Sequence, residues 1–213
     1  MKKFILRWGM ALLPSLIFAE DVSLSASVDI ISNYVYRGMS QSDDKGSAKV
    51  GLNSYYNGFY AIATAQTVDF GTDDGFELDY CIGYSNVWGI ITYDLNYFVT
   101  NYDGSSDRSK ELALGLSTEV VQGLTLGATY AKGIDEAPDN LNFKVGYNFE
   151  IANLNLDYND YDTLGQAITL GISKGLDVSG YSVNTALNYT NFSTDSTFIQ
   201  NQNNLYLVIG VSF

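Results

Sequence analysis

The sequence predicts an all-β protein: a closed antiparallel up-and-down transmembrane β-barrel of about 12 strands. Apolar and polar residues alternate with a period of two over segments of about ten residues, the length that lets a tilted strand cross a bilayer. Long polar connections alternate with tight turns. The polar faces carry mainly Gly, Ser, Asn and Thr, whereas a soluble barrel would carry charged residues outside and large side chains inside.

The first 19 residues, MKKFILRWGMALLPSLIFA, precede the first such segment. Basic residues are followed by an apolar run from Trp8 to Phe18 and by the small residue Ala19, which is the layout of a secretory signal peptide. We therefore expect a signal peptide at residues 1–19 and a single barrel domain at residues 20–213. The expected location is the outer membrane of a Gram-negative bacterium.

The first six alternating segments are residues 22–36, 47–56, 58–67, 75–85, 87–100 and 110–121. In the first, apolar side chains occupy the even positions up to Ile30, while Ser and Asp occupy the odd ones. The fourth opposes Phe, Leu, Tyr and Ile to Glu, Asp, Cys and Gly. The third is the least regular, because FYAIATAQT is almost apolar on both faces, and totals of ten or 14 strands remain open.

The other six segments are residues 123–132, 140–149, 152–160, 166–174, 180–191 and 204–213. The last one places Leu205, Leu207 and Ile209 on one face and ends in Phe213. This arrangement resembles the signal by which bacterial outer-membrane barrels are recognised for insertion. We therefore expect the last strand to pair with the first, because a sheet in lipid must leave no edge unpaired.

The connections alternate in length along the chain. Long segments such as RGMSQSDDKG follow the odd-numbered strands, whereas tight turns such as Asn57-Gly58 and Gln122-Gly123 follow the even-numbered ones. The long loops are expected outside the cell and the short turns in the periplasm. Aromatic residues near strand ends are expected to form the interfacial girdles of a membrane barrel; they are Tyr34, Tyr36, Tyr55, Tyr56, Tyr97, Tyr102, Tyr147, Phe149, Tyr189 and Phe192.

The composition excludes several functions. The chain has no histidine, the usual general base of hydrolases and the commonest zinc ligand. Its single cysteine, Cys81, cannot form an intramolecular disulfide, and the net charge of −13 disfavours nucleic acid. No spacing indicates a catalytic group, so we expect no enzyme activity, cofactor or metal centre. The acidic loops lack the EF-hand spacing, and weak bridging of divalent cations to lipopolysaccharide remains open.

Residues 32–70 resemble the opening of the Gcw_chp family of proteobacterial proteins. The likeness is carried by NYVYRGMSQSDDK, GFYA and VDF, and continues with FELDYCIGY. Members of that family are thought to be outer-membrane β-barrels without an assigned activity. The resemblance therefore implies a fold and a location, and says almost nothing about chemistry.

The ionisable residues on the polar faces are the candidates for lining the lumen. Arg37 shares the odd-numbered face of its segment with Asp29, so it is expected inside the barrel, paired with an acidic neighbour, while Gly38 turns the chain into the loop. The complete set is Arg37, Asp29, Lys49, Glu77, Asp79, Asp94, Lys144 and Asp157. Their mixed signs predict a network of charges across the lumen.

Two functions fit these features. One is a narrow channel for small hydrophilic or cationic solutes, because small inward side chains leave room for water and an acidic excess favours cations. The other is a non-conducting barrel that binds a partner or stiffens the membrane. The expected partners are membrane lipid, lipopolysaccharide and, through the last strand, the barrel-assembly machinery.

Overall fold

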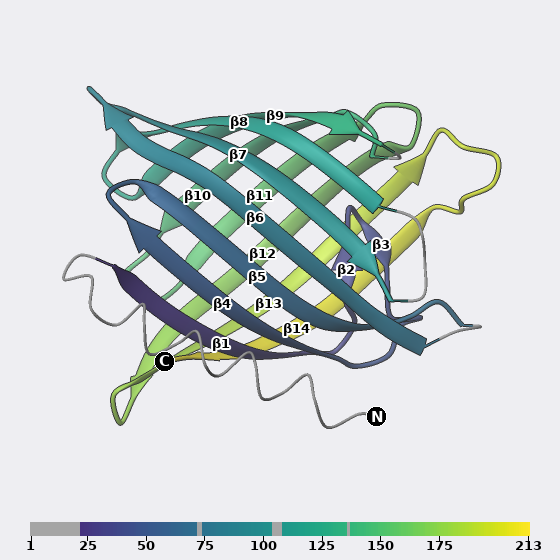
Figure 1. Cartoon of the computed structure of the whole chain (residues 1–213), viewed down its shortest axis with the longest axis horizontal. Helices are drawn as coiled ribbons and strands as arrows, with labels where there is room; N and C mark the ends of the chain where they lie inside the picture. Colours follow the sequence, from purple (N-terminus) through teal and green to yellow (C-terminus); the bar gives the residue numbers. More distant parts are fainter. Residues whose placement is uncertain (1–21, 72–73, 104–107, 136) are drawn as a thin grey trace.

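The protein is a single closed β-barrel (Figure 1). The computed structural model describes residues 22–71, 74–103, 108–135 and 137–213, so the predicted signal peptide lies outside the described residues. Twelve strands follow one another around the barrel, and β14 pairs with β1 to close it. They are β1 (Ser23–Ile31), β4 (Ser47–Tyr56), β5 (Phe59–Asp69), β6 (Asp74–Trp88), β7 (Ile91–Tyr102), β8 (Arg108–Val121), β9 (Leu124–Ile134), β10 (Asn140–Asn148), β11 (Asn153–Tyr161), β12 (Gly165–Val178), β13 (Tyr181–Thr194) and β14 (Gln202–Ser212).

All neighbouring strands of the barrel are antiparallel, as the alternation and the turns predict. Following the Cα partners once around the barrel returns to β1 displaced by about 16 residues, which gives 12 strands a tilt of about 45° and a backbone radius of about 12 Å. Within the described part of the chain, no helix is long and apolar enough to cross a bilayer.

The two faces of the barrel differ in polarity. On β14, Leu205, Leu207 and Ile209 point outward and are exposed, whereas Asn204 points inward and is buried. The same outward row of leucine, isoleucine, valine and aromatic side chains continues around the barrel. Since burying apolar surface is worth roughly 25 cal/mol per Å², a belt of this kind is stable only against an apolar environment. The predicted fold class and the predicted orientation of the faces are confirmed.

The first connection differs from the prediction. The first strand was expected to run from residue 22 to residue 36, but β1 ends at Ile31. The chain then forms a hairpin of two short strands, β2 (Val35–Tyr36) and β3 (Met39–Ser40), which pair only with each other. This hairpin lies within the outline of the barrel, at the end that carries the long loops (Figure 1).

Candidate functional site: the inner hairpin and the lumen

Residues 33–42, which we call the inner hairpin, turn sharply at their centre. Arg37 and Gly38 both have positive φ, at 52° and 86°, and Tyr36 pairs with Met39 across them. Positive φ at both central residues is the geometry of a type I′ turn, whose twist matches that of the flanking strands. Glycine takes this conformation freely, but arginine pays about 1–2 kcal/mol for it. The surrounding structure must therefore hold Arg37 in place.

The tip of the hairpin is packed against the far wall of the barrel. A Cβ atom added to Gly38 would lie 2.9 Å from Cβ of Phe192 and 3.0 Å from Cβ of Ala167, so only glycine fits without movement. Asn204 donates its side-chain N–H to the carbonyl of Gly38 at 3.0 Å. Together with Tyr161, Phe192 and Ala167 form a small buried apolar cluster. The contacts of Gly38 with Ala167, Phe192 and Asn204 hold the hairpin against β12, β13 and β14.

Arg37 fastens the hairpin to β8 and β11. Its guanidinium forms an ion pair with Glu111, and the two side chains are only 8% and 10% exposed. The guanidinium carbon also lies 5.1 Å from the ring centroid of Tyr36 and 5.2 Å from that of Tyr161, within range of cation–π attraction. The positive charge of Arg37 is thus compensated inside the barrel.

A second contact joins the hairpin to β6. The hydroxyl of Tyr34 donates a hydrogen bond to a carboxylate oxygen of Glu77, and both residues are buried. Because Glu77 lies on β6 and Gly38 contacts β12 to β14, the hairpin crosses the lumen rather than lying along one wall. The inner hairpin therefore narrows the lumen near its long-loop end.

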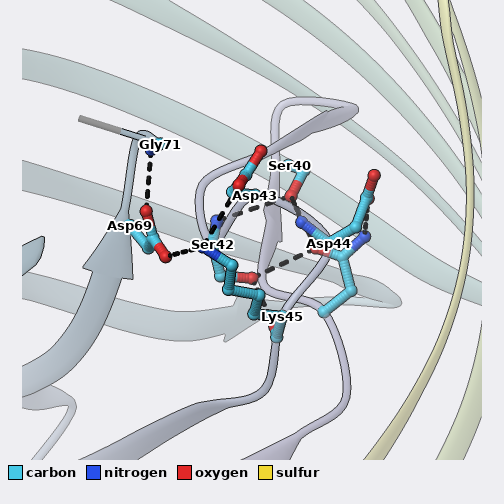
Figure 2. Close-up of polar contacts among 8 residues, drawn as sticks. Ser40, Ser42, Asp43, Asp44, Lys45, Asp69 and Gly71 are labelled. Carbon is cyan, nitrogen blue, oxygen red and sulfur yellow. Dashed lines mark hydrogen bonds and ion pairs between the residues drawn. The ribbon is translucent and has the colours of Figure 1, made fainter. Parts of the chain in front are cut away.

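The turn that follows the hairpin is tied to the end of β5 (Figure 2). Lys45 Nζ lies 2.5 Å from Oδ2 of Asp69 and 3.2 Å from Oδ2 of Asp43. The hydrogen bond to Asp69, and after it the one to Asp43, raises the pKa of Lys45. Asp44 accepts a hydrogen bond at 2.7 Å from the side chain of Asn33, and this bond connects the turn to the inner hairpin.

A polar pocket of about 360 Å³ lies beside this turn. The hairpin, the end of β5 and the start of β14 line it with acidic and amide side chains, one hydroxyl and one aromatic ring. The lining residues are Ser40, Asp43, Asp44, Asp69, Phe70, Gln202, Asn203 and Asn204. The entrance on the long-loop side is therefore acidic.

The structure places the eight predicted lumen residues in separate groups. Lys144 and Asp157 are Cα partners on β10 and β11 and form an ion pair at 3.3 Å. Asp29 and Lys49 are Cα partners on β1 and β4, without an ion pair between them among the described contacts. The remaining ones lie on β6, β7 and the inner hairpin, and are Glu77, Asp79, Asp94 and Arg37.

Asp94 forms a group of its own on β7. Both of its carboxylate oxygens accept from the hydroxyl of Tyr60 at 2.9 Å, and one accepts from Asn96 at 2.6 Å. Glu77 and Asp79 lie close together nearer the long-loop end. The Lys144–Asp157 ion pair joins neighbouring strands, whereas the ion pair of Arg37 with Glu111 joins the inner hairpin to β8.

Sequence reasoning missed Glu111, Asn204 and the packing role of Phe192. Glu111 shares the alternating inner positions of β8 with Ala113, so the period of two was a usable signal.

The expectation that Tyr34, Tyr36, Tyr55, Tyr102 and Phe192 belong to an interfacial girdle is wrong. Phe192 is fully buried, and Tyr34 and Tyr36 belong to the inner hairpin, because the chain leaves β1 before reaching them. Tyr55 and Tyr102 point into the barrel, because they are the Cα partners of the inward residues Tyr60 and Glu77.

The acidic loops are only partly described. Asp73, Asp107 and Glu136 lie outside the described residues. Asp135 and Asp139 form ion pairs with Lys110 and Lys132. Within the described part of the chain, no group of three or more His, Cys, Asp or Glu side chains is arranged to hold a metal ion.

A closed barrel with a polar interior and an inward-folded first connection defines a porin-like fold. The chain matches the model of a family described as "Bacterial protein of unknown function (Gcw_chp)" over residues 18–198, and it belongs to that family. The inner hairpin consists of the residues NYVYRGMSQS, which carry part of the sequence resemblance to the family. No curated protein matches the chain.

Several solved outer-membrane porins have a similar fold. A structure of the KdgM porin is similar with a TM-score of 0.64 at 10% identity, covering 89% of this chain and 98% of that one. The KdgM porin in complex with disordered oligogalacturonate gives 0.62 at 9% identity, covering 89% and 97%. The NanC porin gives 0.58 at 12% identity, covering 90% and 99%. At these identities the likeness shows a shared fold.

Proposed function

We propose that this protein is a bacterial outer-membrane channel for small hydrophilic solutes, with a preference for cations. The observation that carries the proposal is the polarity of the closed barrel, whose outer face is apolar and whose inner face is lined by small polar and acidic side chains. An apolar belt suits the hydrocarbon of a bilayer, and a polar interior suits water and solutes. The fold shared with solved porins supports the same function.

The preference for cations follows from the inward-facing charges. Arg37 is neutralised by Glu111, and Lys144 by Asp157. Among the described residues that we predicted to line the lumen, Lys49 is the basic one left to balance the carboxylates of Asp29, Glu77, Asp79 and Asp94. A pore whose fixed charge is negative raises the local concentration of cations and lowers that of anions. An acidic oligosaccharide such as the oligogalacturonate of the KdgM complex would therefore be disfavoured here.

Conductance in planar bilayers tests the proposal. Refolded protein is inserted into a neutral lipid bilayer, and the reversal potential is measured across a KCl gradient. We expect discrete conductance steps and a reversal potential of the sign set by K⁺ permeation. An anion-selective reversal potential would reject the preference for cations, and the absence of steps would reject the channel.

The inner hairpin favours a second candidate, a non-conducting barrel. It crosses the lumen from β6 and β8 to β12, β13 and β14, and its contacts there are buried. A double variant, Arg37→Gln with Glu111→Gln, removes the charges that fasten it. A silent wild type together with a conducting double variant would identify a plugged barrel, whereas equal conductance of the two would leave the channel as the function.

The proposed location and partners follow from the same surfaces. The outward side chains of β14 and its neighbours would contact membrane lipid and lipopolysaccharide. The barrel-assembly machinery would recognise the outward apolar side chains of β14. Fractionation of cells that express the protein tests the location. Recovery in the inner membrane or the periplasm would contradict it.

A further inference from the structure

We propose that Glu77, Asp79 and Gln66 form an internal binding site for a hard divalent cation, with Ca²⁺ as its best ligand. The site lies beneath the inner hairpin on the inner faces of β5 and β6. It depends on the barrel fold and on these side chains, and it does not depend on the proposed conduction of solutes.

The register of the sheet brings the three residues together. Glu77 and Asp79 are two positions apart on β6, so their side chains emerge on the same inner face about 7 Å apart at the backbone. Gln66 on β5 is the Cα partner of Glu77. Tyr102 on β7 is the Cα partner of Glu77 on the other side. Oxygen-bearing side chains therefore surround Glu77 on both neighbouring strands.

Both carboxylates are buried without a compensating positive charge. Glu77 is 2% exposed, Asp79 is 8% exposed and Gln66 is 1% exposed. Among the described residues, no lysine or arginine forms an ion pair with Glu77 or Asp79, since Arg37 pairs with Glu111. Two adjacent buried carboxylates without a counter-charge repel each other and lose their hydration. A bound cation removes both penalties.

Neutral hydroxyl donors satisfy only part of the site. Asp79 accepts from Thr100 at 2.8 Å and from Thr64 at 3.1 Å. Glu77 accepts from Tyr34 through one oxygen and also interacts with the hydroxyl of Tyr102. Two buried acceptors have no hydrogen-bond partner, namely Oε2 of Glu77 and Oε1 of Gln66. These two oxygens belong to residues that are Cα partners on neighbouring strands. Both are acceptors only, so a positively charged ligand between them would satisfy both.

Rotating the side-chain amide of Gln66 by half a turn would place a hydrogen-bond donor beside Glu77, but it would not compensate the negative charges of Glu77 and Asp79. The rotated amide would aim its N–H₂ at Glu77 and its oxygen at Ser47, whose hydroxyl now accepts from Gln66 at 3.3 Å. The Ser47 hydroxyl already donates its proton to the carbonyl of Thr67 at 2.8 Å, so the rotated amide oxygen would still lack a donor. The rotation adds no positive charge, so the repulsion between Glu77 and Asp79 persists.

The donor set determines the class of cation. It consists of oxygen atoms alone, from two carboxylates, an amide and neighbouring hydroxyl groups, and oxygen ligands select hard cations. Two carboxylates favour a double charge over a single one. Ca²⁺ tolerates six to eight oxygens in irregular geometry, whereas Mg²⁺ demands a near-ideal octahedron. Because the site has two carboxylates, the other ligands would be neutral oxygens and water.

Binding at this site would also hold the inner hairpin. Tyr34 donates to one oxygen of Glu77, and the other oxygen is buried without a hydrogen-bond partner. A cation that keeps Glu77 ionised and fixed strengthens this acceptor for Tyr34. Ca²⁺ is therefore expected to stabilise the docked position of the hairpin as well as the barrel.

Calorimetric titration in detergent micelles tests the proposal without any conductance measurement. Refolded protein is stripped with EDTA and titrated with CaCl₂ in 0.15 M NaCl. We expect one saturable site, weakened at least tenfold in the double variant Glu77→Gln with Asp79→Asn. The matched control, Glu150→Gln with Asp162→Asn, removes two exposed loop carboxylates away from the inner hairpin and is expected to keep the site. Circular dichroism and heat-modified gel mobility establish that each variant is folded.

Tb³⁺ luminescence supplies a second readout. Excitation of tyrosine sensitises bound Tb³⁺, and Tyr34 and Tyr102 adjoin the site. The variant Gln66→Met keeps the volume and both carboxylates but removes the amide oxygen, so it should weaken Tb³⁺ and Ca²⁺ binding if the double variant fails to fold. Absence of saturable binding by the wild type would overturn the proposal, as would loss of binding in the loop control alone. An infrared band of a protonated carboxyl that disappears in Glu77→Gln, without Ca²⁺ binding, would overturn it in favour of a shared proton.

Discussion

Replacing Glu111 by glutamine removes the counter-charge of a guanidinium that lies inside the barrel. The side chains of Arg37 and Glu111 are 8% and 10% exposed, so Arg37 cannot recover its hydration without leaving its site. Removing one partner of a buried ion pair costs about 3–5 kcal/mol. The rings of Tyr36 and Tyr161 remain against the guanidinium and offset about 1 kcal/mol. We expect Glu111→Gln to lower the free energy of unfolding by about 2–4 kcal/mol.

Urea unfolding in lipid vesicles measures this difference. Trp88 is the last residue of β6 and is exposed, so its fluorescence reports withdrawal of the barrel from the bilayer. The matched control is Asp157→Asn, which breaks the ion pair with Lys144. Those side chains are 21% and 55% exposed, so their pair contributes less than about 1 kcal/mol.

The double variant decides whether the two charges act on each other. Arg37→Gln with Glu111→Gln should cost less than the sum of the single variants, by about 1–3 kcal/mol, because each single variant leaves one charge buried and unpaired. Additive costs, or equal costs for Glu111→Gln and Asp157→Asn, would refute the argument that a buried ion pair fastens the hairpin.

Three further substitutions test the packing. Gly38→Ala introduces a Cβ 2.9 Å from Phe192 at a φ of +86°, whereas Gly180→Ala has the same φ and open space, so melting curves should show Gly38→Ala to be the more destabilising by about 1–3 kcal/mol. Phe192→Ala empties the buried cluster and should lower the unfolding free energy in urea by about 3–5 kcal/mol. Leu207→Arg, on the outer face, should cost about 2–4 kcal/mol in vesicles near the membrane midplane, and a neutral result would contradict the lipid-facing assignment.

The barrel was predictable from sequence because its signal repeats in every strand. A period of two marks the face of each residue independently of its neighbours, so one irregular segment such as 58–67 did not disturb the count. That segment forms β5, whose outward face carries Ala61, Ala63 and Ala65 while Ile62 points inward. Its weak alternation reflects a small-residue outer face. Strand boundaries differ from the predictions by a few residues, which is the scale of fraying at strand ends.

The inner hairpin was not predictable in the same way, because its position depends on contacts far apart in sequence. Parity places Arg37 with Asp29 only if β1 continues beyond Ile31, and it does not. Arg37 lies inside because the hairpin folds back and finds Glu111 and Tyr161 there. Neither partner is marked by local pattern as a partner of residue 37, so no rule based on strand period connects them.

The same reasoning explains why the family resemblance and the candidate site coincide. A lipid-facing strand tolerates many apolar residues, since it needs only hydrophobicity and the strand period. The inner hairpin needs a glycine that fits against Phe192, an arginine that accepts a positive φ, and a tyrosine whose hydroxyl reaches Glu77. Each requirement specifies a residue type rather than a class. These requirements restrict the residue types of the inner hairpin more than a lipid-facing strand is restricted, and the hairpin lies where a solute or a cation would meet the buried carboxylates.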